Sequence, residues 1–121
     1  MFSSAKEVRE AIAARKKELE MLEELMQFEN DNCSLWNGDH SLYEMFLMQE
    51  RRAETIKDTI EVCKPLVAKL QADEDRYFDL LGKISELKEE TEEKKTLCRE
   101  HTSCETQILT TYRLLWAMLM V

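Results

Sequence analysis

Three residues of metal-ligand type lie close together near the end of the sequence, in the order Cys98-x-x-His101-x-x-Cys104. Thiolates and imidazoles are ligands that zinc prefers in proteins. On a helix, however, Cys98 and His101 share a face and Cys104 has rotated away from it, and a fourth ligand would have to come from elsewhere. We therefore predict no metal and no cofactor, and keep a metal-dependent switch at these residues as an alternative. We interpret His40 as a solvated loop residue.

The sequence shows no recognisable catalytic motif. It has no glycine-rich phosphate loop, no nucleophile elbow and no His-Glu-x-x-His metal motif. The Glu-x-x-His pattern of di-iron bundles is also absent. The many carboxylates are typical of solvated helix faces. We therefore predict that the chain is not an enzyme.

Composition is typical of long amphipathic helices, with 35% charged and 44% hydrophobic residues among 121. Two glycines and one proline are too few for the turns of a sandwich or barrel. The formal net charge of −8 argues against direct binding to nucleic acid or to acidic surfaces. We expect contact with any acidic polymer to come through a basic partner.

No segment has the pattern of a signal peptide or of a membrane span. The N-terminus lacks an apolar core of signal-peptide length. The most apolar stretch, residues 108–121, is shorter than the roughly 20 residues that cross a bilayer, and it contains Thr110, Thr111 and Arg113. We therefore expect an intracellular, soluble protein whose cysteines are free thiols.

Hydrophobic periodicity predicts an all-α fold, a helical hairpin followed by a long Pro-kinked coiled-coil helix. The single helical domain of residues 1–121 is expected to contain helices at about 4–28, 41–63 and 65–120, with a polar loop at 29–40.

Local signals set these boundaries. Capping-box patterns begin at Ser4 and Ser41. Pro65 is expected to kink the chain or to start a new helix, and the heptad phase continues across it. Residues 88–96 are polar on all sides, and an alternative helix end lies near residue 105.

Apolar residues recur at spacings of three and four and form a long seam, which we predict binds partner helices. The first helix is too short to cover the rest of this seam, and the C-terminal run is apolar on every side. Because a homodimer would place like charges together at Arg52 or Asp73, a hetero-oligomer is favoured; an intramolecular bundle is the alternative. The predicted partner-binding residues are Val8, Ile12, Leu19, Leu22, Met26, Trp36, Leu42, Met45, Ile56, Leu66, Leu70, Tyr77, Leu80, Ile84, Leu87, Ile108, Tyr112, Leu115, Trp116 and Leu119.

Two segments, 43–47 (Tyr-Glu-Met-Phe-Leu) and 84–90 (Ile-Ser-Glu-Leu-Lys-Glu-Glu), resemble stretches of the coiled-coil subunits of the outer-kinetochore microtubule-binding complex. The order of short helix, polar loop, longer helix, Lys64-Pro65 and further helix resembles the small subunit of the spindle-and-kinetochore-associated (Ska) complex. The apolar run 112–121 departs from the polar tail of that subunit. The resemblance implies a scaffold subunit in chromosome segregation, at the kinetochore or in the cytoplasm, that contacts microtubules only through basic partners.

Other binding classes remain open. A vesicle-tethering or intraflagellar-transport adaptor would have the same helical pattern, and so would a stand-alone helical bundle that acts as a binding module.

Overall fold

The computed structural model describes residues 1–31 and 40–120 of the chain, and the side chains of residues 1–29 and 43–120. This part of the chain contains three helices and no strand: α1 (Ala5–Asp31), α2 (His40–Glu86) and α3 (Glu92–Leu119). The all-α prediction is therefore confirmed. Predicted residue Trp36 and most of the predicted loop lie outside the described residues.

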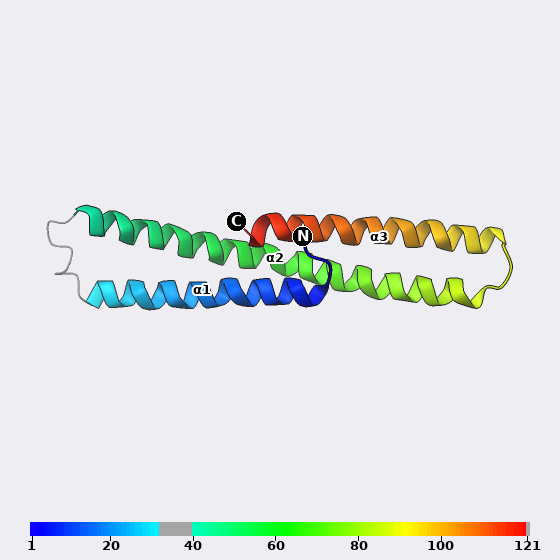
Figure 1. Cartoon of the computed structure of the whole chain (residues 1–121), viewed down its shortest axis with the longest axis horizontal. Coiled ribbons are helices and arrows are strands. Elements are labelled where there is room, and N and C mark those ends of the chain that lie inside the picture. The colour runs from blue at the N-terminus through cyan, green and yellow to red at the C-terminus, as the bar shows by residue number, and fades with distance from the viewer. Residues whose placement is uncertain (32–39, 121) are drawn as a thin grey trace.

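The three helices form an elongated molecule in which α2 runs the full length (Figure 1). Helix α1 lies antiparallel to the first half of α2, and α3 lies antiparallel to the second half. The two chain ends meet near the middle of α2 (Figure 1). The molecule thus has two arms that are two helices thick, the N-arm (α1 with the first half of α2) and the C-arm (α3 with the second half), joined by a middle that is three helices thick.

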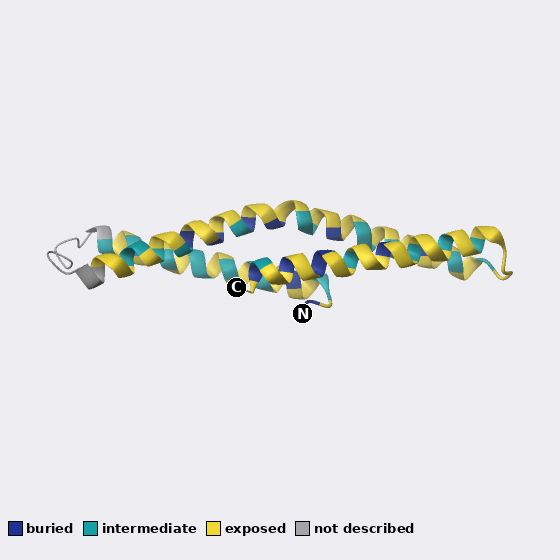
Figure 2. Ribbon diagram, turned by 90° about the horizontal axis from the view of Figure 1, so that it is seen from above, coloured by how far each residue is buried: buried dark blue, intermediate teal, exposed yellow. Residues whose placement is uncertain are grey.

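The hydrophobic core lies in this middle section, where all three helices meet. Val8 comes from α1, Cys63 and Leu70 come from α2, and Leu115 and Leu119 come from α3; all five side chains are at most 1% exposed. Buried positions are concentrated along the inner faces of the helices in Figure 2. Apolar burial at this point therefore holds both arms to one long helix.

The predicted helix 65–120 is wrong, because the chain reverses direction at residues 87–91. Residues 88–91, which follow the half-buried Leu87, have no apolar face to bury, and Thr91 starts a new helix. The Thr91 hydroxyl accepts a hydrogen bond from the Lys94 amide at 3.2 Å. Glu92 and Glu93 occupy the first turn, where carboxylates interact favourably with the helix dipole.

The predicted helix end at residue 63 is also wrong, since Pro65 lies inside the continuous helix α2. Proline removes one amide donor, at a cost of about 3 kcal/mol within a helix. Cys63 and Leu70 on either side of it are buried in the core, and this packing offsets the cost. In Figure 2, α2 is a single bowed ribbon without a break.

The starts of α1 and α2 differ slightly from the predicted capping boxes. The Ser4 hydroxyl accepts a hydrogen bond from the Glu7 amide at 3.3 Å, as expected. The Glu7 carboxylate, however, accepts from the Ser3 amide at 2.9 Å, one residue earlier than expected. Helix α2 begins at His40, so this residue belongs to a helix and not to the predicted loop.

Candidate partner-binding surface

Most of the predicted partner seam is turned inward and holds the chain's own helices together. Among its described side chains, only Met45, at 54%, and Trp116, at 36%, are exposed. The side chain of Leu42 lies outside the described residues. The buried members are Val8, Ile56, Leu70, Leu80, Tyr112, Leu115 and Leu119, and the half-buried members are Ile12, Leu19, Leu22, Met26, Leu66, Tyr77, Ile84, Leu87 and Ile108.

One face of the apolar C-terminal run is covered within the chain, without another chain, whereas Leu114, at 49%, and Met120, at 53%, remain exposed. Leu115 and Leu119 are fully buried in the same cluster as Val8 of α1. The Trp116 ring meets the Phe2 ring edge-to-face, with centroids 5.1 Å apart and an interplanar angle of 76°. A partner would therefore have to contact the two exposed seam residues, Met45 and Trp116, or residues outside the seam.

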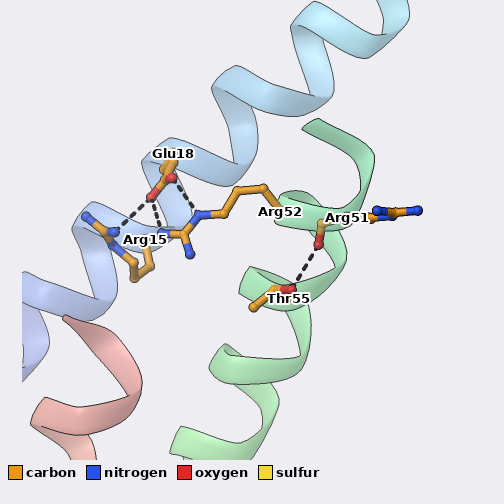
Figure 3. Close-up of polar contacts among 5 residues, drawn as sticks. All are labelled: Arg15, Glu18, Arg51, Arg52 and Thr55. Carbon is orange, nitrogen blue, oxygen red and sulfur yellow. Dashed lines mark hydrogen bonds and ion pairs between the residues drawn. The ribbon is translucent and has the colours of Figure 1, made fainter. Parts of the chain in front are cut away.

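Arg52, whose charge favoured a hetero-oligomer in the predicted seam, pairs with Glu18 of the same chain (Figure 3). Its Nε and Nη2 atoms donate to the two carboxylate oxygens of Glu18 at 2.9 and 3.3 Å. Arg15 lies 2.9 Å from the same carboxylate, so Glu18 bridges two guanidinium groups across α1 and α2. The like-charge argument against a homodimer therefore no longer holds at Arg52.

We expect this bridge to make folding depend on pH. The hydrogen bond from Arg52 and the two nearby positive charges lower the pKa of Glu18 below its ordinary value of 4.5. Its stabilisation is then present above about pH 4.5 and is lost as the pH falls through the folded-state pKa. Because the side chain is 33% exposed, solvent screening limits the loss in Glu18→Gln to about 1 kcal/mol at neutral pH.

Urea unfolding at neutral pH and near pH 3 measures this effect. Glu18→Gln should lower the free energy of unfolding at neutral pH and approach the parent chain at low pH. Glu20→Gln, on the exposed face of the same helix, is the matched control and should show little difference at either pH. An equal loss at both pH values would mean that the bridge does not stabilise the fold through its charge.

The Cys98, His101 and Cys104 triplet does not converge on one point. Cys98 is exposed, whereas the Cys104 thiol is buried and donates to the Asp73 carbonyl oxygen at 3.0 Å. Burial raises the pKa of Cys104, which disfavours the thiolate that a metal needs. The His101 ring stacks on Tyr77 with centroids 4.2 Å apart. Within the described ranges, no group of three His, Cys, Asp or Glu residues is placed to hold a metal ion.

An apolar groove of about 400 Å³ opens in the C-arm, next to the start of α1. Phe78 of α2 is 65% exposed and Leu109 of α3 is 49% exposed, on the two sides of the groove. We call this feature the C-arm groove. It is lined by Ser3, Ser4, Ala5, Glu74, Tyr77, Phe78, Glu105, Ile108, Leu109 and Tyr112.

Carboxylates give the C-arm groove an acidic character. Glu74 on α2 accepts a hydrogen bond from the Tyr112 hydroxyl at 2.7 Å, and Glu105 on α3 is exposed. Burial, followed by the hydrogen bond to Glu74 and the charges of Glu74 and Glu7, raises the pKa of Tyr112 well above its usual range. The phenol therefore stays protonated and holds the Glu74 carboxylate at the groove.

Sequence periodicity missed Phe78 and Leu109 because both fall one residue after a seam position. Two adjacent bulky residues on a helix cannot face the same core, since each residue turns the side chain by about 100°. The pairs Tyr77-Phe78 and Ile108-Leu109 therefore contain the signal that one member points outward. The sequence alone does not say that the two outward members lie on one groove.

No protein-family model, curated protein or solved structure matches this chain. The resemblance to kinetochore subunits thus depends on the two sequence segments and on the predicted order of elements around Lys64-Pro65. Among the described helices, none has an apolar stretch long enough to cross a bilayer.

Proposed function

We propose that this chain is a non-catalytic scaffold subunit of a multi-protein helical assembly, and that it binds an amphipathic partner helix in the C-arm groove. The exposure of Phe78 and Leu109 on either side of one groove is the observation that supports this proposal. Large apolar side chains that share a groove favour a protein contact, whereas scattered ones are ordinary surface.

The position of the groove suggests how a partner would lie. The middle of the molecule has three helices around its core, but the C-arm has two (Figure 1). Ser3, Ser4 and Ala5 line the groove, so it lies where α1 begins. A helix seated there would continue the line of α1 and restore a three-helix cross-section. Full burial of Phe78 or Leu109 would contribute at most about 1.5–3 kcal/mol each, since both are already partly covered.

The charge of the groove defines the chemistry of the partner. Glu74 and Glu105 flank the apolar surface, and the chain has a net charge of −8. A partner helix with leucines on one face and lysines or arginines beside them would match both features. This charge supports a hetero-oligomer, because a basic chain is the better occupant of an acidic groove.

The resemblance of segments 43–47 and 84–90 to kinetochore coiled coils supports an assembly in chromosome segregation, with basic partners making any microtubule contact.

A second candidate function is a stand-alone binding module. The burial of Leu115 and Leu119 by the chain's own helices favours that candidate, because it lets the chain fold before any partner binds.

A pair of designed peptides tests the groove directly. We expect a helical peptide of about 15 residues, with leucines on one face and lysines beside them, to bind, and its glutamate counterpart not to bind. The double variant Phe78→Ser/Leu109→Ser should raise the Kd for the lysine peptide at least about tenfold. Val62→Ser, which removes another exposed apolar side chain of α2, is the matched control. Isothermal titration calorimetry measures each Kd, and binding that ignores both the peptide charge and the double variant would contradict the proposal.

Microscopy of the tagged chain in dividing cells separates the cellular settings. Foci at kinetochores that disappear in the Phe78→Ser/Leu109→Ser variant would support the segregation role. Location on vesicles or in cilia would instead point to a tethering or intraflagellar adaptor. Diffuse fluorescence of both forms would favour a stand-alone module.

A further inference from the structure

One row of residues on α2 faces α3 in the C-arm and continues into the N-arm. Its members are seven residues apart: Met45, Arg52, Thr59, Leu66, Asp73, Leu80 and Leu87. The buried residues Ile56, Cys63 and Leu70, each at most 2% exposed, are also seven apart. Helix α2 therefore keeps the period of a coiled coil past Pro65, and the row keeps its place beside the core.

The two ends of this row are covered differently. In the C-arm, Leu80 is 4% exposed, and the Asp73 carbonyl oxygen accepts a hydrogen bond from the Cys104 thiol of α3. In the N-arm, which α3 does not reach (Figure 1), Met45 is 54% exposed. The described part of the N-arm thus leaves open the side of α2 that a third helix covers elsewhere.

An exposed leucine of α1 lies across from Met45. The ion pair of Arg52 with Glu18 sets the register of the two antiparallel helices. Seven residues earlier on α2 and seven later on α1, the same register places Met45 opposite Leu25. One more methionine lies a single turn from each of these residues on its own helix. We call these four residues the N-arm patch: Met21 (57% exposed), Leu25 (46%), Met45 (54%) and Met48 (68%).

The charge of the N-arm indicates what would cover the patch. Residues 6–17 of α1 contain five basic and two acidic residues, whereas residues 18–31 contain six acidic residues and no basic residue. Among the acidic ones, Glu24 is exposed and lies between Met21 and Leu25 in the sequence. A second copy would bring two such acidic segments together, which is unfavourable. A basic partner matches this charge.

The α2 side of the patch is more balanced. A hollow of about 300 Å³ at this edge is lined by Glu44, Leu47, Met48 and Arg51. At the inner end of the patch, Arg15 and Arg52 are paired with Glu18. The acidic excess is therefore on the α1 side, and the basic residues of a partner would lie there.

We propose that the N-arm patch is a second docking surface, which binds a basic amphipathic helix of a partner in line with α3. Leucines on one face of that helix would contact the patch, and lysines or arginines beside them would lie along the acidic half of α1. Methionine side chains are flexible, so three of them adapt readily to an incoming apolar face. The bound helix would give the N-arm the three-helix cross-section of the middle.

This inference goes beyond the proposed function, because it adds a surface on the other arm. It takes the chemistry of the partner from the charge of the N-arm itself, so it does not depend on the C-arm groove. A chain that docks one basic helix on each arm would bind a partner with two such helices more tightly than one site does, through effective concentration.

Calorimetric titration of the Phe78→Ser/Leu109→Ser chain with the lysine peptide tests the patch separately, since the C-arm groove is disabled there. We expect the parent chain to bind two peptides and this chain one. Adding Leu25→Ser/Met45→Ser should raise the remaining Kd at least about tenfold. Leu114→Ser, which removes a leucine of α3 that is 49% exposed, is the matched control and should leave the Kd unchanged.

A charge reversal tests the basic character of the partner. Glu24→Lys should raise the Kd of the lysine peptide for the N-arm patch about threefold or more. Glu54→Lys makes the same change at an exposed position of α2 outside the patch, and it should have little effect.

Three results would overturn the inference. The first is one site on the parent chain and none on the Phe78→Ser/Leu109→Ser chain, which would leave the C-arm groove as the docking surface. The second is a remaining Kd that Leu25→Ser/Met45→Ser does not change. The third is a homodimer, seen by analytical ultracentrifugation, that Leu25→Ser/Met45→Ser abolishes, because a second copy would then cover the patch. A single site that only Leu25→Ser/Met45→Ser weakens would instead support the N-arm patch and contradict the C-arm groove.

Discussion

Leu115→Asp is expected to unfold the middle of the molecule, whereas Leu114→Asp, one residue earlier, should leave the fold intact. Leu115 is fully buried between α1, α2 and α3, and Leu114 is 49% exposed. Truncating a buried leucine to alanine costs about 2–5 kcal/mol, and aspartate adds the cost of burying a charge without a partner. For a domain of this size, that loss is comparable to the whole free energy of unfolding.

Circular dichroism and urea unfolding of the two variants measure the difference. Leu114→Asp should lose less than about 0.5 kcal/mol, as is usual for surface substitutions. If both variants unfolded the chain equally, Leu114 would also be covered, and the C-terminal run would need another chain after all. If Leu115→Asp stayed folded, the core would not be at the position that the structure gives it.

The periodicity of the sequence identified the apolar face of each helix but not what covers that face. Leu70 and Leu115 were both expected in the seam, and both are fully buried. A seam of this kind looks the same whether the second helix belongs to the same chain or to another, because spacing along one helix has no information about the direction of the next. The pairing of Arg52 with Glu18 was hidden for the same reason.

Two predicted helix boundaries are wrong, at residues 87–91 and at Pro65, and they are wrong for different reasons. The reversal at 87–91 contains no glycine or proline, so its Leu-Lys-Glu-Glu-Thr sequence has the propensity of a helix. The available signal was Thr91 followed by two glutamates, which is a helix start. Pro65 locally predicts a helix end, but the packing of the residues on either side keeps α2 continuous. Packing of Cys63 and Leu70 decided the outcome at Pro65, whereas the Thr91 cap is what starts the new helix after the reversal.

The outward-facing surfaces could be predicted only in part. Adjacent bulky pairs such as Tyr77-Phe78 show that one side chain must leave the core, and the charge asymmetry of α1 is visible in the sequence. That Phe78 and Leu109 lie on one groove requires knowing that α2 and α3 are antiparallel. The groove thus depends on the reversal that periodicity did not show.

Phe2→Ala should be the most damaging change outside the helices, lowering the free energy of unfolding by about 3 kcal/mol. Phe2 is 7% exposed and lies in the core cluster, with its ring edge-to-face on Trp116 of α3. Each arm alone is two helices thick, and Phe2 and Val8 are the buried residues through which the start of the chain closes the three-helix middle. Removing the ring would leave a cavity and would uncover Trp116.

Met1→Ala is the matched control, since Met1 is 69% exposed and one residue away. Urea unfolding followed by tryptophan fluorescence should show a loss for Phe2→Ala and almost none for Met1→Ala. A double-mutant cycle with Trp116→Ala should give a coupling of about 0.5–1.5 kcal/mol between the two rings. A coupling of zero would mean that the chain ends do not meet, and the two arms would then be independent hairpins on a shared helix.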